Sequence, residues 1–200
     1  MNILHDVPLF PLDTVLYPGS MLPLKIFELR YMDMAKACLK NDSSFGVCLI
    51  ASGRETGAPA LPHEVGTLAR IARWDMPQLG VLQVRCHGEQ RFRVVSRRVE
   101  TSGLQRADIE VAEDLGPAPL EARHEFLASL LSRIIDQIGD VPYFLPPRFD
   151  DSVWVGYRLC ELLPISLPDK QKLLELDDHV VRLDAVHRFL LDKGLLSPSR

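Results

Sequence analysis

The sequence predicts an α+β protein: a small closed or nearly closed sheet with one inserted helix, followed by a bundle of helices. Up to about residue 115, short apolar or alternating runs separated by Gly, Pro and Ser are typical of strands. Beyond that point, apolar residues recur every three or four positions, which is typical of amphipathic helices. The segment 114–119 between them contains one glycine and two prolines and has the composition of a linker. We therefore expect one domain over residues 1–115 and a second over residues 116–200.

The first 41 residues predict two strands and then a helix. Four prolines between residues 8 and 23 lie too close together for central strands, so we expect strand edges and bends there. Lys40 and Asn41 stand where the following helix should stop. Its apolar face is expected to comprise Phe27, Tyr31, Met34, Ala35, Cys38 and Leu39.

The remaining strands of the first part are predicted from short runs. We expect them at residues 45–50, 65–74, 81–87, 90–95 and 107–113. Gly88 and Glu89 separate two of these runs, and glycine as the first of two loop residues predicts a type II′ hairpin. The segment Trp74–Pro77 is expected to form the turn before that hairpin.

The second part predicts four helices. Leu131 and Ile135 lie on the apolar stripe of the first helix and are expected in the core, and Gly139 should end that helix. Residues 141–149 are too rich in proline for a helix and are expected to pack along the bundle as a loop. The expected caps of the three later helices are Asp150–Ser152, Ser166 with Asp169, and Asp177 or Asp178.

Composition and charge exclude several classes of protein. Hydrophobic residues make up 46% and charged residues 25%, as in a soluble globular protein, and no apolar run is long enough to span a membrane. The net charge of −4 argues against a general nucleic-acid binder. Without a signal peptide, we expect a cytoplasmic protein whose four cysteines are buried, reduced thiols. Neither these cysteines nor the six histidines show metal-ligand spacing, so we expect no metal or cofactor.

Several motifs resemble those of one family. Residues 8–31, PLFPLDTVLYPGSMLPLKIFELRY, are similar to the opening of the Lon protease N-terminal domain, a segment also found in cereblon. Further similar segments are EVGTLARI at 64–71, GEQRFRV at 88–94 and KQKLLEL at 170–176. The resemblance covers nearly the whole chain. It implies a PUA-like mixed β-barrel with one inserted helix, followed by an all-α helical bundle.

The chain departs from the full-length proteases of that family. It lacks the GxxxxGK[ST] phosphate loop of their ATPase and the Gly-Pro-Ser-Ala-Gly context of their Ser-Lys peptidase nucleophile. The cysteine-ligated zinc domain of cereblon is missing as well. The resemblance therefore implies a non-enzymatic protein that binds unfolded or tagged polypeptides, or an adaptor to a protease or chaperone. A hydrolase, suggested by the family name alone, is an alternative.

Large apolar residues beside prolines mark the expected peptide-binding surface. Proline limits the entropy lost on binding, and strand edges keep unpaired backbone groups, so such segments suit peptide recruitment. The alternative is that these side chains pack in the core or in turns. The candidate residues are Tyr17, Met21, Leu22, Trp74 and Met76.

Six arginines between residues 85 and 106 offer a second candidate surface. They suggest a partner such as RNA or an acidic peptide, because PUA-like folds often bind RNA. The alternative, which we favour, is a solvated strand face on which Arg91 and Arg93 point the same way, since phosphate binding needs concentrated charge.

Overall fold

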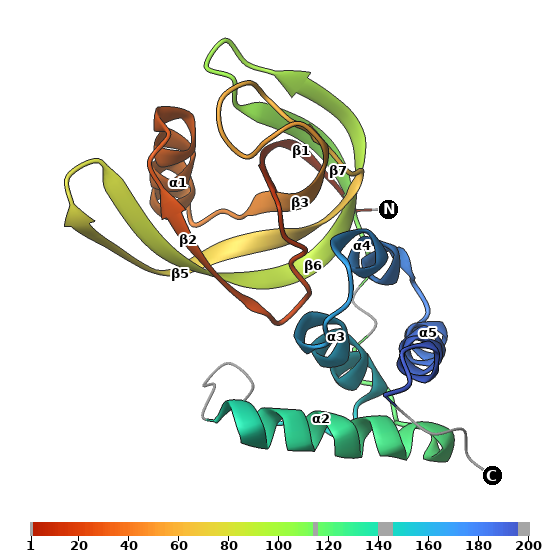
Figure 1. Cartoon of the computed structure of the whole chain (residues 1–200). Coiled ribbons are helices and arrows are strands. Elements are labelled where there is room, and N and C mark those ends of the chain that lie inside the picture. Colours follow the sequence, from red (N-terminus) through yellow and green to blue (C-terminus); the bar gives the residue numbers. More distant parts are fainter. Residues whose placement is uncertain (1, 114–115, 140–145, 196–200) are drawn as a thin grey trace. The chain divides into compact units, whose positions relative to one another are not determined.

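The computed structural model of the chain describes residues 2–113, 116–139 and 146–195. By its internal contacts the chain divides into two compact units, Met1–Asp114 and Leu115–Arg200. The first unit is built from strands with an inserted helix and the second from helices, which confirms the predicted α+β class (Figure 1). Of the loop expected at residues 141–149, positions 141–145 lie outside the described residues.

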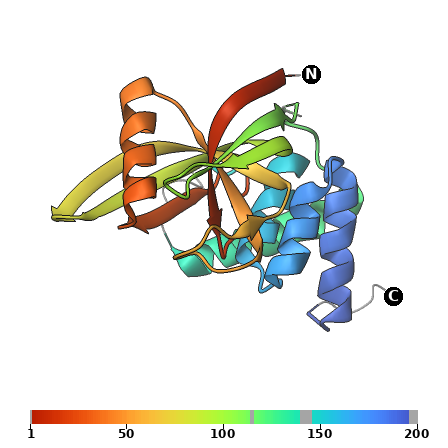
Figure 2. The same cartoon turned by 90° about the horizontal axis from the view of Figure 1, so that it is seen from above.

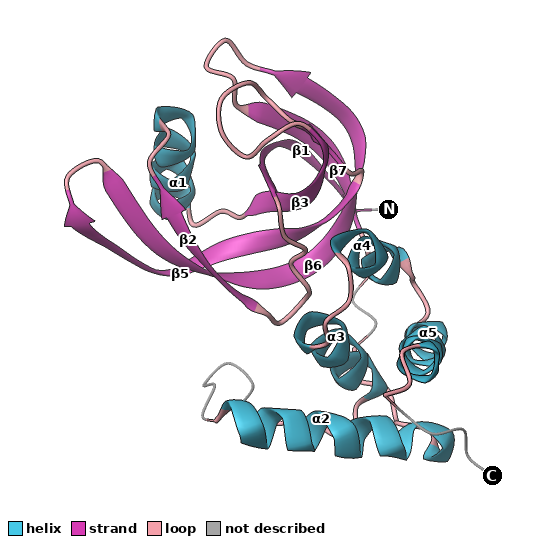
Figure 3. Cartoon of the chain, in the orientation of Figure 1, coloured by secondary structure: helices cyan, strands magenta, loops and turns pink. Residues whose placement is uncertain are grey.

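The strands of the first unit close into a ring. Consecutive neighbours are β1, β7, β6, β5 and β3, and β3 pairs in turn with β1 (Figure 3). Of these pairs, β1–β3 is parallel and the others are antiparallel. Outside the ring, β2 pairs with β6, and β4 pairs with β3. The strands are β1 (Asn2–Leu12), β2 (Met21–Ile26), β3 (Phe45–Ser52), β4 (Leu61–Pro62), β5 (Val65–Gln78), β6 (Val81–Val99) and β7 (Gln105–Val111).

One helix, α1 (Leu29–Asn41), crosses the long strands β5 and β6 and covers one face of them (Figure 2). Its apolar face packs into a core cluster that also holds Ile26, Leu82 and Val84. Phe27 lies before the helix, because Glu28 has an extended backbone with φ −75° and ψ 132°. The side chain of Phe27 is 60% exposed, so its expected place on the buried stripe is wrong. Leu39, which was also expected on this face, is 36% exposed. The buried apolar residues of α1 are Tyr31, Met32, Met34, Ala35 and Cys38.

The expected hairpin at Gly88 is also wrong, because β6 runs through this position without a turn. A Cβ atom on Gly88 would lie 2.5 Å from the carbonyl oxygen of Tyr17. The segment before β2 is held there by two hydrogen bonds of 2.8 Å, from the Gly19 N–H to the Gly88 carbonyl and from the Gly88 N–H to the Ser20 carbonyl. Glycine therefore permits a close approach of two backbones. The turn lies instead at Gly80, whose φ is 84°.

The second unit contains a short 3₁₀ turn and four α-helices among its described residues. Three predicted caps are confirmed: Asp151 accepts hydrogen bonds from the Val153 and Trp154 N–H groups, and Ser166 and Asp178 cap the next two helices in the same way. In the described part of the chain, no helix combines the length and apolarity needed to cross a membrane. The elements are η1 (Ala122–His124), α2 (Glu125–Ile138), α3 (Ser152–Leu162), α4 (Leu167–Glu175) and α5 (His179–Asp192).

Full burial along α2 is limited to its first two turns. Leu131 is fully buried, as predicted, but Ile135 is half-buried and Ile138 is 51% exposed. The regular apolar stripe thus continues beyond the fully buried part of the helix, and the expectation that Ile135 lies in the core is wrong.

A buried arginine joins three helices of the second unit. Arg182, on α5, is fully buried and its Nε donates to the Leu173 carbonyl at 3.1 Å. A second nitrogen donates to the Leu176 carbonyl, and the guanidinium lies 4.3 Å from the centre of the Tyr157 ring. Arg182 therefore donates hydrogen bonds to one carbonyl in the last turn of α4 and to another just beyond its end.

Candidate functional site

A groove of about 400 Å³ runs beside β2 in the first unit. The buried side chains of Phe10, Leu12 and Tyr31 line it from the core, and Phe10 and Tyr31 stack with ring centroids 3.9 Å apart. Such a volume lies within the range of ordinary ligand sites. We name it the β2 groove; its lining residues are Phe10, Leu12, Thr14, Leu22–Glu28, Tyr31, Glu55 and Thr56.

The β2 groove follows the edge of the strand rather than one of its faces. Five consecutive residues, Leu22–Ile26, line it. Side chains alternate between the two faces of a strand, so a hollow over one face would touch only every second residue. Among the strands described, β2 pairs with β6 alone, and its other edge lies open along the groove.

The polar groups near Tyr31 make one end of the groove acidic. Burial raises the pKa of the Tyr31 hydroxyl, Arg30 opposes this rise, and Glu28 and Glu55 add to it. The Glu28 carboxylate forms an ion pair with Arg30 at 2.9 Å. The Glu55 carboxylate accepts a hydrogen bond of 2.6 Å from the Asp13 N–H, and no cation of the described residues lies within ion-pair distance of it. Glu55 therefore remains an exposed negative charge on the rim.

The five candidate residues predicted from the sequence lie in different environments in the structure. Tyr17 is fully buried, so its side chain does not lie on a binding surface. Leu22 lines the β2 groove, whereas Trp74 and Met76 lie within β5 and not in the turn that was expected. Met21 pairs with His87, an exposed residue on the opposite side of the sheet from the core.

Register explains which of these residues share a face. Residues directly opposite in an antiparallel pair point to the same side of the sheet. Leu22 lies opposite Cys86, and Trp74 lies opposite Val84. Cys86 and Val84 belong to the core cluster under α1. Leu22 and Trp74 therefore project to the side that α1 covers.

Three exposed apolar residues were not among the candidates. Phe27 lines the β2 groove, and Leu29 at the start of α1 is 73% exposed. Leu79, at the tip of the β5–β6 hairpin, is 94% exposed. The glycine of the Leu79-Gly80 dipeptide is the sequence signal that indicates this turn, which was expected instead at Trp74–Pro77.

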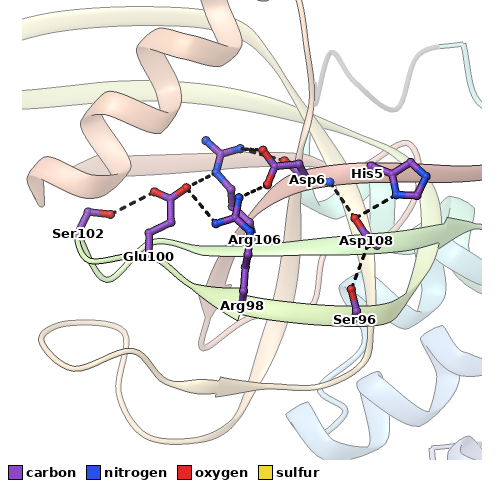
Figure 4. A network of polar contacts seen from close by, with 8 residues as sticks. All are labelled: His5, Asp6, Ser96, Arg98, Glu100, Ser102, Arg106 and Asp108. Carbon is purple, nitrogen blue, oxygen red and sulfur yellow. Dashed lines mark hydrogen bonds and ion pairs between the residues drawn. The ribbon is translucent and has the colours of Figure 1, made fainter.

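Carboxylates form ion pairs with two residues of the arginine-rich stretch (Figure 4). Arg106 contacts Glu100 at 2.6 Å and Asp6 at 3.3 Å, and Arg98 pairs with the same two carboxylates. Arg91 is buried whereas Arg93 is exposed, so they do not form the shared solvated face that was expected. The stretch therefore does not present one continuous cationic surface.

The carboxylate of Asp108 belongs to the same network. It accepts a hydrogen bond of 3.1 Å from the Asp6 N–H and contacts the His5 ring at 3.2 Å (Figure 4). The Asp6 N–H, aided by His5 and Ser96, lowers the pKa of Asp108. Asp6 has a positive φ of 58°, where β1 shifts register against β7. The network thus holds an irregular backbone segment in place.

Two thiols of the first unit are buried in apolar surroundings. Burial raises the pKa of the Cys48 and Cys86 thiols to about 12, so both stay protonated at neutral pH. No cluster of His, Cys, Asp or Glu suited to a metal ion occurs within residues 2–113, 116–139 and 146–195. The geometry of the β2 groove instead offers apolar contacts and backbone hydrogen bonds.

Comparison with known proteins places the chain among substrate-binding domains. Residues 6–192 match the family model of the ATP-dependent protease La (LON) substrate-binding domain. The Lon protease of Cytophaga hutchinsonii is 24% identical over 94% of this chain, and cereblon of Gallus gallus is 29% identical over 54% of it. The alignments span 24% and 25% of those two proteins, so the chain matches about a quarter of each.

Solved structures agree with this assignment. The Lon N-terminal domain protein from Xanthomonas campestris is 37% identical, with a TM-score of 0.79, and the match covers 92% of this chain and 98% of that one. The N-terminal domain of the Mycobacterium avium complex Lon protease shares the fold, with a TM-score of 0.61 at 17% identity over 94% of this chain and 98% of that one. The chain therefore belongs to the Lon substrate-binding domain family.

Proposed function

We propose that the first unit binds exposed apolar segments of polypeptide chains in the β2 groove, without catalysing a reaction. One observation carries this proposal: an apolar hollow runs along an unpaired strand edge, and Phe27 stands exposed beside it. Apolar lining with a few placed polar groups is what polypeptide recognition requires. Leu22 belongs to this site, and Trp74, Met76 and Leu79 on the β5–β6 hairpin would extend it for longer clients.

The setting we propose is protein quality control. The matched family model is named for substrate binding by a protease, which supports a client-binding or adaptor role beside a protease or chaperone. Four buried free thiols support a reducing compartment such as the cytoplasm. The ion-paired Arg98 and Arg106 favour a polypeptide over RNA, because paired guanidinium groups add little to phosphate affinity.

We further propose that the ring of the first unit is a PUA-like barrel and that residues 1–115 and 116–200 are separate domains. The closed circuit of five strands with α1 inserted between β2 and β3 supports the first assignment. The denser contacts within each unit support the second. Expressing residues 1–115 alone and recording a cooperative unfolding transition would test the domain assignment.

The experiment for the proposed function is a binding titration with a chemically unfolded, fluorescently labelled model protein. Phe27→Ser should weaken binding about tenfold, because it removes a large apolar contact from the groove without emptying the core. Val99→Ser is the matched control, since Val99 is 55% exposed and does not line the groove. Equal affinities of the two variants, or no binding of the client by the parent protein, would contradict the proposal.

A further inference from the structure

We propose that the occupant of the β2 groove is an extended polypeptide segment that adds as a strand to the outer edge of β2. Its apolar side chains would enter the groove on alternate residues, and a Lys or Arg would lie near Glu55. This inference rests on the proposed function and names the class of segment that the same site selects.

The pairing with β6 fixes which backbone groups of β2 point toward the sheet. The Ser20 carbonyl accepts a hydrogen bond from the Gly88 N–H, in the register that continues through Met21–Ile26. Bonded and non-bonded pairs alternate along an antiparallel ladder. Counting on from the Ser20 carbonyl, Leu22, Leu24 and Ile26 turn both their N–H and carbonyl groups toward β6, whereas the Ser20 N–H itself donates to the Tyr17 carbonyl. The residues between them turn these groups outward.

The outward-facing residues are Met21, Pro23 and Lys25. Pro23 is compatible with this alternation, because proline has no N–H and is tolerated in a strand where the N–H would point away from the neighbouring strand. No described group is hydrogen-bonded to the outward backbone atoms of these three residues. The edge therefore offers two N–H donors and three carbonyl acceptors, enough to pair with one short strand.

The groove also provides for the side chains of such a strand. An added strand lies about 5 Å from β2, and every second side chain points to the side that α1 covers. That side carries the apolar surfaces of Phe10, Leu12 and Tyr31. Alternating apolar residues would therefore face the groove, while the residues between them would face solvent.

The charge of the rim selects further among extended segments. Glu55 is exposed and has no described cationic partner. Lys25 also borders the groove, but it lies opposite the exposed Gln83, so its side chain points to the other face. A cationic residue in the segment is thus favoured over an acidic one.

The test uses a labelled nonapeptide of alternating Val and Thr with Lys at both ends. Two further versions carry N-methyl groups on all Val or on all Thr amides. Residues that share a face of a strand also share the direction of their N–H groups, so only one version blocks pairing with β2. We expect that version to bind about a hundredfold more weakly, from three lost hydrogen bonds at about fivefold each, and the other to bind within about threefold of the parent.

The outcomes separate this inference from the proposed function. Equal affinity of the two methylated peptides, whether both bind or both fail, overturns strand addition. The proposed function would still hold after that result if the unfolded client binds the parent protein and Phe27→Ser weakens this binding. Equal binding of peptides with Lys or Glu at both ends overturns the selection of a cationic residue.

A variant of the protein gives an independent check. Lys25→Pro removes the outward N–H of that residue, whereas Lys25→Gln changes the side chain and keeps the N–H. We expect the peptide to bind Lys25→Pro about fivefold more weakly than Lys25→Gln, with cooperative unfolding retained in both. Equal binding overturns the proposal. A dimer of the parent protein in sedimentation that Lys25→Pro dissociates would also overturn it, because the occupant would then be a second copy.

Discussion

Replacing Gly88 by Ala should destabilise the first unit by about 2–4 kcal/mol. The added Cβ would lie 2.5 Å from the Tyr17 carbonyl oxygen, about 0.9 Å closer than an ordinary contact. Relieving this overlap separates the segment before β2 from β6 and weakens the two hydrogen bonds that Gly88 makes there. Each bond contributes about 1 kcal/mol, and the overpacking adds a further 1–2 kcal/mol.

Gly80→Ala is the matched control for this substitution. Gly80 has a positive φ of 84°, but no atom lies within 4 Å of where its Cβ would stand. The cost there is conformational strain alone, about 1–2 kcal/mol. If Gly88 served a turn, as the sequence suggested, both substitutions would cost about the same.

The assay is urea unfolding followed by tryptophan fluorescence. Trp74 reports on the first unit when Trp154, in the second unit, is replaced by Phe, so both glycine variants would be made in that background. The free energies of unfolding follow from the midpoints and slopes of the transitions. A Gly88→Ala variant no less stable than Gly80→Ala would refute the argument from close approach.

Three more outcomes are expected. Arg182→Met should destabilise the second unit by about 2–5 kcal/mol, because the final carbonyls of α4 lose their donors, and a loss as small as that of the exposed Arg188→Met would show that Arg182 does not act as a cap. Leu131→Ala should cost about 2–5 kcal/mol, clearly more than Ile135→Ala in the same thermal or urea unfolding series; equal costs would contradict the assigned burial. The pKa of Asp108 is lowered in the folded state, so as pH falls the unfolded state binds a proton first, and the stabilisation from Asp108 is lost below about pH 4. Asp108→Asn should therefore reduce the loss of stability at acid pH when unfolding is measured as a function of pH. An unchanged loss at acid pH would exclude this contribution.

The sequence was informative where structure is decided locally. Caps such as Asp151 and Asp178 bond to backbone groups two or three residues away, so their spacing alone identifies them. The apolar positions of α1 and α2 follow from helical periodicity in the same way. The predictions were wrong at the ends of these patterns, because Phe27 and Ile135 continue the helical spacing but are not buried in the core.

The β2 groove could not be predicted from the sequence, because it depends on pairing between distant strands. Whether β2 has an open edge is decided by where β1, β3 and β7 pair, and those partners lie up to about a hundred residues apart. Gly88 illustrates the same limit. A glycine in a turn and a glycine beside another backbone look alike until the Tyr17 carbonyl is placed next to it.

The closed ring has a consequence for how the protein is made. Asn2 pairs with Val111, so the first strand of the ring meets its last partner only after nearly the whole unit has been synthesised. Until then β1 and β6 have open edges, which are prone to pair with other chains. Contacts between residues so distant slow folding, and we expect the unit to fold in milliseconds to seconds rather than microseconds. A nascent chain of this protein therefore passes through a period in which it resembles the clients proposed for it.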